Sequence, residues 1–282
     1  MRLAVRNRAF IFFSLVMPMG FFFFFVGVLG RGNRLAVPYM LAPVLALTVM
    51  GSFWGLSVQL VTFREQGILR RFRLAPVGPG AMLVSSIVSN YILMLPTVAL
   101  ELLLARWLFH MEHWGDLWSI WALVTLGTVT FATLGLTVAS VTNTLQETQV
   151  INNIIWSVFL FLSGALVPLP MLPAFVQRFA VFLPATYLVT GLRRAIVREA
   201  TVWQVGTELL ALAGGAAMAF FISVQLFRWE PEERVTGRAK VWAAATIIPF
   251  LLLGIWESAH GQLRRDEQTI FHSNFLKQLP KP

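Results

Sequence analysis

Long apolar stretches alternate with short polar ones along most of the chain. A helix needs about 20 mostly apolar residues to cross the hydrocarbon core of a bilayer, and most of these stretches reach that length. The pattern therefore predicts six membrane-spanning helices, at residues 10–29, 37–60, 81–105, 117–141, 150–167 and 205–227. This is the pattern of an all-α integral membrane protein whose bulk lies within a bilayer.

A further apolar stretch lies near the C-terminus, at residues 241–256, and contains only 16 residues. At helical rise it covers about 24 Å, which is less than the bilayer core of about 30 Å. It either lies at the interface or forms a seventh span. We favour a span, because an Ala, Ile and Leu-rich stretch bounded by Lys240 and Glu257 has few other uses. The chain thus divides into a six-helix transmembrane domain, residues 1–228, and a C-terminal extension, residues 229–282.

Composition agrees with a membrane protein, since 57% of the residues are hydrophobic and 12% are charged. Soluble domains have about 45–50% apolar and about 25% charged residues. The net charge of +9 does not indicate nucleic-acid binding, because the Lys and Arg residues flank apolar stretches, where they meet lipid headgroups. The chain contains no cysteine, which excludes disulfides, thiolate metal sites and cysteine nucleophiles.

The distribution of cations predicts the orientation. With a cytoplasmic N-terminus, eleven Lys and Arg residues lie inside and seven outside, counted through the sixth span. This bias favours a multi-pass protein of the cell (inner) membrane with its N-terminus in the cytoplasm. If the seventh stretch also crosses, the four cations of the tail make the count eleven on each side.

Few residues suggest catalytic or metal chemistry. His110 and His113, with neighbouring acids, have an i, i+3 spacing that would suit metal ligation on a helix, but a polar loop with interfacial side chains is the favoured explanation, and we predict no metal site. Glu101 and Glu208 lie in predicted spans near the external ends, and intramembrane carboxylates are candidates for function. No phosphate-binding loop of the form Gly-x4-Gly-Lys-Ser/Thr occurs, so hydrolysis of ATP by that route is excluded for this chain.

The polar segment at residues 62–80 predicts a short amphipathic helix at the inner membrane surface. Its apolar side chains share one side and its cationic side chains spread around the other: Ile68, Leu69 and Phe72 against Arg70, Arg71 and Arg73. Pro76 ends the helix, because a residue before proline avoids helical geometry. The residues alone leave two interpretations open, a linker anchored to headgroups or a lever that docks into a cytoplasmic partner.

The segment Glu65-x-Gly67-x-Leu69-Arg70-Arg71 with Pro76 resembles the coupling helix in permeases of type-2 ATP-binding-cassette (ABC-2 type) exporters, including the daunorubicin-exporter-like branch. A later run of motifs is similar to the same family: Phe161-Leu-Ser-Gly164, Pro168, Leu172-Pro173, Leu183-Pro184 and Tyr187 to Arg193. In that family these mark the end of the fifth span and a re-entrant pair of external helices. The resemblance covers about residues 6–227, and the short segment before the first span departs from it.

The resemblance implies the permease subunit of an ATP-driven exporter that moves a hydrophobic or amphiphilic substrate, such as a drug, lipid or glycan. It implies a second permease copy, as a homodimer or heterodimer, and separate nucleotide-binding subunits that hold ATP and Mg, with no cofactor and no catalytic residue on this chain. Coupling to the ATPase would involve the turn at residues 143–149 and Arg64, Glu65, Gly67, Ile68, Leu69, Arg70, Arg71, Phe72 and Pro76. The external re-entrant motif would comprise Ser163, Gly164, Pro168, Pro173 and Pro184.

The substrate path would involve the few polar groups of the second and fifth spans, namely Gln59, Asn152, Asn153 and Ser157. The same side chains could instead form hydrogen bonds between helices, worth only about 0.6 kcal/mol each. Two other functions remain as alternatives, a secondary transporter or channel that acts without an ATPase and a membrane-embedded enzyme. The lack of charged groups near the membrane midplane argues against the first.

Overall fold

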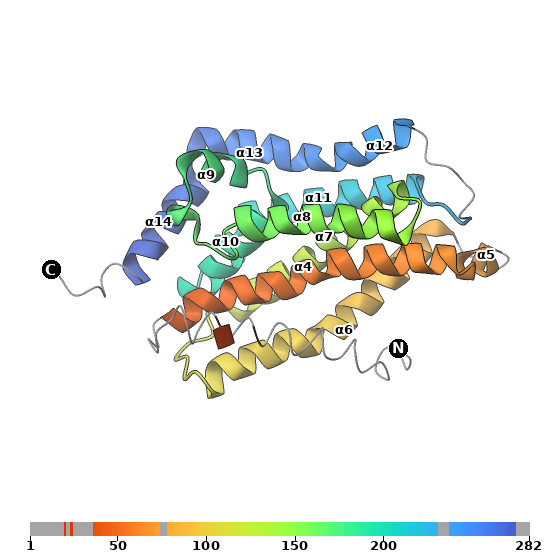
Figure 1. Cartoon of the computed structure of the whole chain (residues 1–282). Coiled ribbons are helices and arrows are strands. Elements are labelled where there is room, and N and C mark those ends of the chain that lie inside the picture. The colour runs from red at the N-terminus through yellow and green to blue at the C-terminus, as the bar shows by residue number, and fades with distance from the viewer. Residues whose placement is uncertain (1–19, 21–22, 25–35, 74–77, 231–236, 275–282) are drawn as a thin grey trace.

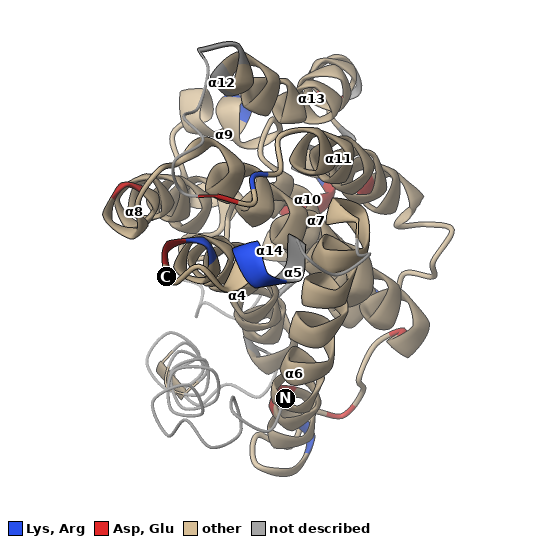
Figure 2. Cartoon of the chain, turned by 90° about the vertical axis from the view of Figure 1, so that its right-hand side faces the viewer, with Lys and Arg blue, Asp and Glu red and all other residues tan. Residues whose placement is uncertain are grey.

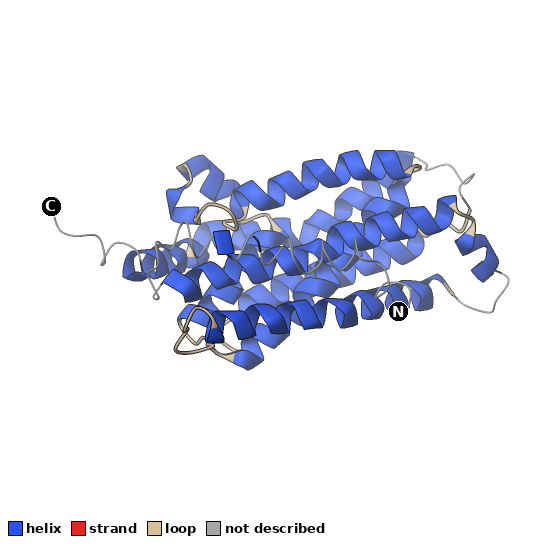
Figure 3. Ribbon diagram, turned by 60° about the horizontal axis from the view of Figure 1, so that its bottom comes forward, coloured by secondary structure: helices blue, strands red, loops and turns tan. Residues whose placement is uncertain are grey.

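The computed structural model describes residues 20, 23–24, 36–73, 78–230 and 237–274, so the first predicted span lies almost wholly outside the described residues. Every regular element within those residues is helical (Figure 3). The helices are α4 (Ala36–Glu65), α5 (Ile68–Arg73), α6 (Pro79–Trp107), α7 (Leu117–Val141), α8 (Leu145–Leu162), η3 (Leu169–Met171), α9 (Ala174–Ala180), α10 (Pro184–Val197), α11 (Gly206–Gln225), α12 (Gly237–Ala244), η4 (Ala245–Ile247), α13 (Ile248–His260) and α14 (Gln262–Asn274).

The helices form a bundle with two ends, which we call the α5 end and the α10 end (Figure 1). Helices α4, α7 and α11 run from the α10 end to the α5 end, and α6, α8 and the α12–α13 pair run back. The C-terminal helix α14 therefore lies at the same end as α9 and α10. Short connections join antiparallel neighbours, as in other helix bundles.

Helix α4 lies at the centre and packs against α7, α10, α6 and α8. Its first half, residues 37–50, is largely apolar on all sides, and nearly every residue there is buried. The closest approach is to α7, where a Cβ atom added to Gly135 would lie 2.2 Å from the carbonyl oxygen of Phe53. The backbones of α4 and α7 therefore touch at this crossing, as small residues allow in membrane helices.

Among the described residues, five helical segments are long and apolar enough to cross a membrane: Val37–Glu65, Pro79–Trp107, Leu117–Val141, Gly206–Gln225 and Val241–Ala259. Four of them correspond to the predicted second, third, fourth and sixth spans. The fifth contains the predicted seventh stretch, which has 19 residues instead of 16 and so agrees with a span.

The predicted fifth span at 150–167 is wrong at both boundaries. Helix α8 begins at Leu145 and ends at Leu162, because Thr144 caps its first turn and Gly164 adopts a left-handed φ of +86°. The residues expected to form a polar turn therefore belong partly to the helix. Helix α8 has only 18 residues and its first turn is polar. It is therefore not among the five segments that are long and apolar enough to cross a membrane.

Helices α9 and α10 meet at an angle of 94° across a short break, which agrees with the predicted re-entrant pair (Figure 1). Helix α10 is buried along nearly its whole length, between α4, α7 and α11. Its arginine side chains pair with acids of other helices, which are described below.

Candidate functional site

Arg64 lies in the last turn of α4 and its side chain is buried, with 1% exposure. Its Nη1 donates a hydrogen bond to the carbonyl oxygen of Ala139 at 3.0 Å, and its Nη2 donates to that of Thr142 at 2.6 Å. These oxygens lie at the C-terminal end of α7, where carbonyls lack helical amide partners. Arg64 thus caps α7 and ties it to α4, instead of lying on the exposed surface expected for docking.

Glu65 makes the neighbouring connection. Its Oε1 accepts a hydrogen bond from the backbone amide of Leu145, the first residue of α8, at 2.7 Å. Thr144 and Glu147 complete this helix start, since Thr144 Oγ1 accepts from the amide of Glu147 and Glu147 accepts from the amide of Asn143. Carboxylates near a helix N-terminus are stabilised by the unpaired amides and the helix dipole. Consecutive residues of α4 therefore hold the end of α7 and the start of α8.

Arg228 connects a fourth helix, α11, to this joint. It follows α11, and its Nη2 donates to the carbonyl oxygen of Thr142 at 2.5 Å while its Nη1 donates to Asn143 Oδ1 at 3.2 Å. The guanidinium groups of Arg64 in α4 and of Arg228 just after α11 thus both donate to the carbonyl oxygen of Thr142. In the sequence Arg228 is one of the cations that flank the predicted spans. Nothing but its position just after the sixth span pointed to a contact with α7. We call Arg64, Glu65, Arg228 and the 142–147 segment the α7–α8 joint.

Helix α5 projects from the α5 end of the bundle (Figure 1). Leu69 is buried, Ile68 is half-buried, and Arg70 and Arg71 are exposed, in agreement with the predicted amphipathic pattern. Figure 2, viewed toward this end, shows cationic residues at α5. The side chain of Phe72, and Pro76 altogether, lie outside the described residues. The segment at residues 62–80 is predicted from the sequence to form one short helix. Its described part instead belongs to two helices, because the left-handed Gly67 ends the run of α4 before α5 begins.

Gly67 has a φ of +67°, and a Cβ atom at this position would find no neighbour within 4 Å. The need for glycine here is therefore conformational, at least within this chain, since L residues resist left-handed geometry by about 1–2 kcal/mol. The coupling role that the resemblance implies for Gly67 stays a prediction.

If the coupling role implied by the resemblance holds, a Gly67→Val variant should lose most ATP-coupled transport, because a β-branched residue opposes the turn that orients α5. A Gly67→Asn variant should retain most of it, because asparagine visits the left-handed region readily. Transport by the two variants, measured with equal amounts of inserted protein, checks this. Equal loss in both variants would indicate instead that the space beside Gly67 is filled in the working complex.

The predicted substrate-path residues fall into two groups. Asn152 is buried, and its Nδ2 donates to Ser57 Oγ at 2.6 Å, so it forms a hydrogen bond between α8 and α4. Gln59, Asn153 and Ser157 are exposed on the outside of the bundle. The structure therefore brings Asn152 into the core and leaves the other three on an outward face of α4 and α8.

The residues of the predicted re-entrant motif all occur at helix boundaries. Ser163 is the C-cap of α8, and the carbonyl oxygen of Gly164 accepts a hydrogen bond from Arg193 at 3.2 Å. Pro168 and Pro173 precede η3 and α9, and Pro184 is the first residue of α10. Proline suits helix starts, because its missing amide would be unpaired there in any case.

Glu101 and Glu208, the two carboxylates in the predicted spans, are both fully buried. Thr48 Oγ1 donates to Glu101 Oε1 at 2.5 Å, and Glu208 pairs with Arg194 at 2.6 Å.

His110 lies beyond the end of α6 with a φ of +55°, so it does not share a helical face with His113. Within the described ranges, no group of three His, Asp or Glu side chains is arranged to hold a metal ion.

Together, the apolar helices, the re-entrant pair and the α7–α8 joint define a multi-pass helical membrane protein. The chain belongs to the ABC-2 type transporter family, which matches residues 1–197. It is a transport permease of this family, although the match does not distinguish the daunorubicin-exporter-like branch, which stays a prediction.

Two relatives from Bacillus subtilis (strain 168) support this assignment. The linearmycin resistance permease protein LnrN is 26% identical over 168 residues, which are 60% of this chain and 42% of the relative. The putative transport permease YvfS is 22% identical over 209 residues, 72% of this chain and 85% of the relative. The match thus spans less than half of LnrN. No solved structure matches the chain significantly.

Proposed function

We propose that the chain is the permease subunit of an ATP-driven exporter, and that the α5 end faces the cytoplasm and receives a separate nucleotide-binding subunit. The observation that carries this proposal is the α7–α8 joint. An exposed cationic helix, α5, follows directly from residues that hold the ends of two other helices. Force applied to α5 therefore acts on α4, α7 and α8 at the same time.

The joint supports a mechanical role because its parts are tightly connected. Packed interiors have low compressibility and transmit displacement. A shallow hollow beside the joint is lined by the first turns of α8, namely Thr144, Gln146, Glu147, Val150 and Ile151. We propose that the ATPase contacts both α5 and this hollow. Closure of the nucleotide-binding dimer would then rock the helices as near-rigid bodies, as in other domain motions.

In this proposal ATP and Mg reside on the partner, and this chain holds no cofactor. The outward face of α4 and α8 carries Gln59, Asn153 and Ser157, which are polar groups exposed at the side of the bundle. Polar side chains facing lipid are costly. This face would therefore pack against a second permease copy, identical or related, and line the substrate path between the two.

The cargo we propose is hydrophobic or amphiphilic. One relative is named as a resistance permease, which is in keeping with export of a toxic compound. The membrane would be the cell (inner) membrane with a cytoplasmic N-terminus. Since the seventh helix returns to the α10 end, the cation count is balanced between the two sides (Figure 1). The proposed orientation consequently rests on α5 and not on charge bias.

Substitution of Glu65 tests the proposal. In proteoliposomes containing the chain and its ATPase, Glu65→Ala should lower ATP-driven export at least about tenfold. The reason is that a charge-assisted hydrogen bond, worth about 1.5–3 kcal/mol, is lost between α4 and α8. Glu112→Ala is the matched control, because Glu112 is an exposed acid at the other end of the bundle.

If the Glu65→Ala variant exports at the wild-type rate, the coupling role is refuted.

The side of the membrane on which α5 lies is tested by an Arg70→Cys variant, because the chain has no other cysteine. A membrane-impermeant thiol reagent should label it from the cytoplasmic side. Labelling from the outside alone would place α5 beyond reach of any ATPase and end the proposal.

A carrier that acts without an ATPase is the second candidate, and Glu101 is the observation that favours it. This buried carboxylate accepts a hydrogen bond from Thr48, while its Oε2 has no hydrogen-bond partner among the described residues. Such groups occur in proton relays of secondary transporters. Transport driven by a proton gradient, in vesicles that lack the ATPase, would favour this candidate over the exporter.

A further inference from the structure

Helix α14 lies outside the part of the chain that matches the family, which ends at residue 197. It follows α13 through Gly261, whose φ is +63°, and it turns back across the α10 end (Figure 1). There it packs against η3 and α10. Helix α14 is therefore attached to the re-entrant region, far from the α7–α8 joint.

The centre of this attachment is a buried ion pair. The side chains of Arg193 in α10 and Glu267 in α14 are 0% and 1% exposed, and Arg193 Nη1 contacts Glu267 Oε2. The same guanidinium donates to the carbonyl of Gly164, and its carbon lies 4.2 Å from the centre of the Tyr39 ring. Arg193 thus connects α14 to α10, to the loop after α8 and to the start of α4.

A second, more exposed set of ion pairs surrounds the first. Asp266 of α14 lies 3.5 Å from Arg194 and 3.1 Å from Arg198, both in or next to the last turn of α10. Arg194 also keeps a partner of its own, Glu208 of α11, at 2.6 Å. Two consecutive acids of α14 therefore face three arginines, and the positive charge of α10 specifies where α14 docks.

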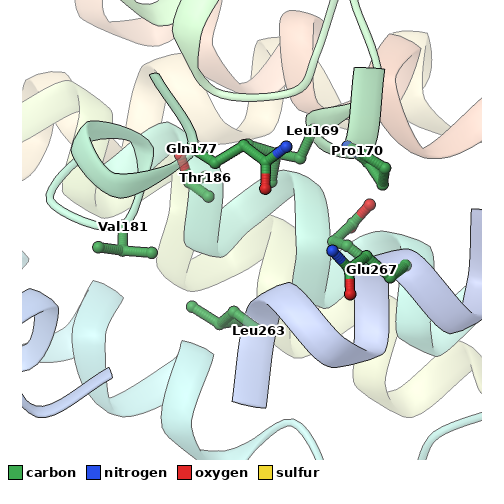
Figure 4. A pocket seen from close by; sticks show the side chains of 8 residues that line it. Leu169, Pro170, Gln177, Val181, Thr186, Leu263 and Glu267 are labelled. Carbon is green, nitrogen blue, oxygen red and sulfur yellow. The ribbon is translucent and has the colours of Figure 1, made fainter. Parts of the chain in front are cut away.

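Apolar packing between α14 and its neighbours leaves one small gap. A small cavity separates Leu263, Glu267 and Gln268 from the re-entrant region (Figure 4), where it is lined by Leu169, Pro170, Gln177, Val181 and Thr186. Glu267 Oε1 and Thr186 Oγ1, which border it, have no hydrogen-bond partner among the described residues. The gap lacks part of the van der Waals contact that a filled interface has. The interface therefore combines ionic contacts, which water can replace when the partners separate, with the apolar contacts of Leu263, Ile270 and Phe271, which are buried.

We propose that α14 is a latch on the re-entrant pair α9–α10. In the resting state it holds the pair against the bundle and closes the α10 end. During export it swings about Gly261, and both Arg193 and Glu267 become hydrated, which limits the cost of separating them. This inference rests on the proposed exporter function, in which the α10 end is the exit side.

Cross-linking tests whether α14 must move. Because the chain has no cysteine, Gln268→Cys and Gln177→Cys together provide a single reactive pair across the cavity, at positions that reagents can reach. Joining them with a short, reducible bifunctional thiol reagent should lower ATP-driven export at least about tenfold, and reduction should restore it. Each single-cysteine variant, treated alike, is the control. Unchanged export by the cross-linked protein would overturn the latch.

Labelling tests the latch without transport. Thr186→Cys places a thiol at a fully buried position beneath α14. Adding Asp266→Ala removes the more exposed ion pairs and leaves Arg194 its partner Glu208, so the fold should persist while the latch loosens. A membrane-impermeant maleimide should then react at least about fivefold faster, even without ATPase. The control is Thr269→Ala, an exposed position on the same helix.

The two arms separate the proposals. If Asp266→Ala leaves the labelling rate unchanged, the latch is wrong whether or not the protein exports. If labelling accelerates but wild-type protein shows no ATP-driven export, the exporter function fails and α14 is a latch on a permease of another kind.

Discussion

Replacing Arg64 with leucine is expected to lower both the stability of the permease and its coupled export by more than any other single change at the α5 end. The buried guanidinium serves Ala139 and Thr142, the carbonyls that end α7. A buried carbonyl that loses its donor costs about 1–3 kcal/mol. Arg228 still donates to Thr142, so the cost falls mainly on Ala139. Thermal unfolding in detergent and export in proteoliposomes measure the two effects.

The chain offers a graded comparison for this prediction. Arg64→Lys keeps the charge, but an ammonium lacks the planar fork that reaches two carbonyls at once, so we expect an intermediate loss. Arg70→Leu removes an exposed arginine six residues later and should change the free energy of unfolding by no more than about 0.5 kcal/mol. If Arg64→Leu unfolds at the wild-type temperature, the cap is unimportant and the joint does not transmit force through α7.

Arg64 and Arg70 also show which structural features can be predicted from the sequence and which cannot. Apolar runs located the membrane helices and periodicity predicted the exposed face of α5, because both properties depend on neighbours along the chain. The burial of Arg64 depends on the end of α7, more than 70 residues away. Local patterns assign such a charge to the surface, because charged residues are rarely buried unless paired.

One missed boundary was present in the sequence. Thr144 and Glu147 have the spacing of a helix start, with a hydroxyl cap followed three residues later by Glu, and the structure shows this arrangement. The polar composition of residues 143–149 nevertheless predicts a turn, because it outweighs the capping signal. The latch residues carried no comparable signal. Arg193 and Glu267 are 74 positions apart, and only the fold of the extension brings them together.

A Gly135→Ala substitution is expected to disturb the whole bundle. The added methyl would lie 2.2 Å from the carbonyl oxygen of Phe53, which is backbone and cannot rotate away, so α7 must move off α4. Overpacking of this kind costs about 1–3 kcal/mol and sometimes more. Gly51→Ala in α4 is the matched control, because its Cβ would meet no atom within 4 Å. We expect that variant to be neutral or slightly stabilised, since alanine favours helix by up to about 1 kcal/mol.

The effect of Gly135→Ala should reach the α7–α8 joint. Gly135 lies one helical turn before Ala139, so a shift of α7 at the crossing also draws that carbonyl away from Arg64. Loss of stability and loss of coupling should therefore occur together, and combining Gly135→Ala with Arg64→Leu should cost less than the sum of the single changes. A double-mutant cycle on the unfolding free energy measures this coupling. Strict additivity would show that the crossing and the cap act independently, and that α4 does not drive α7 through both.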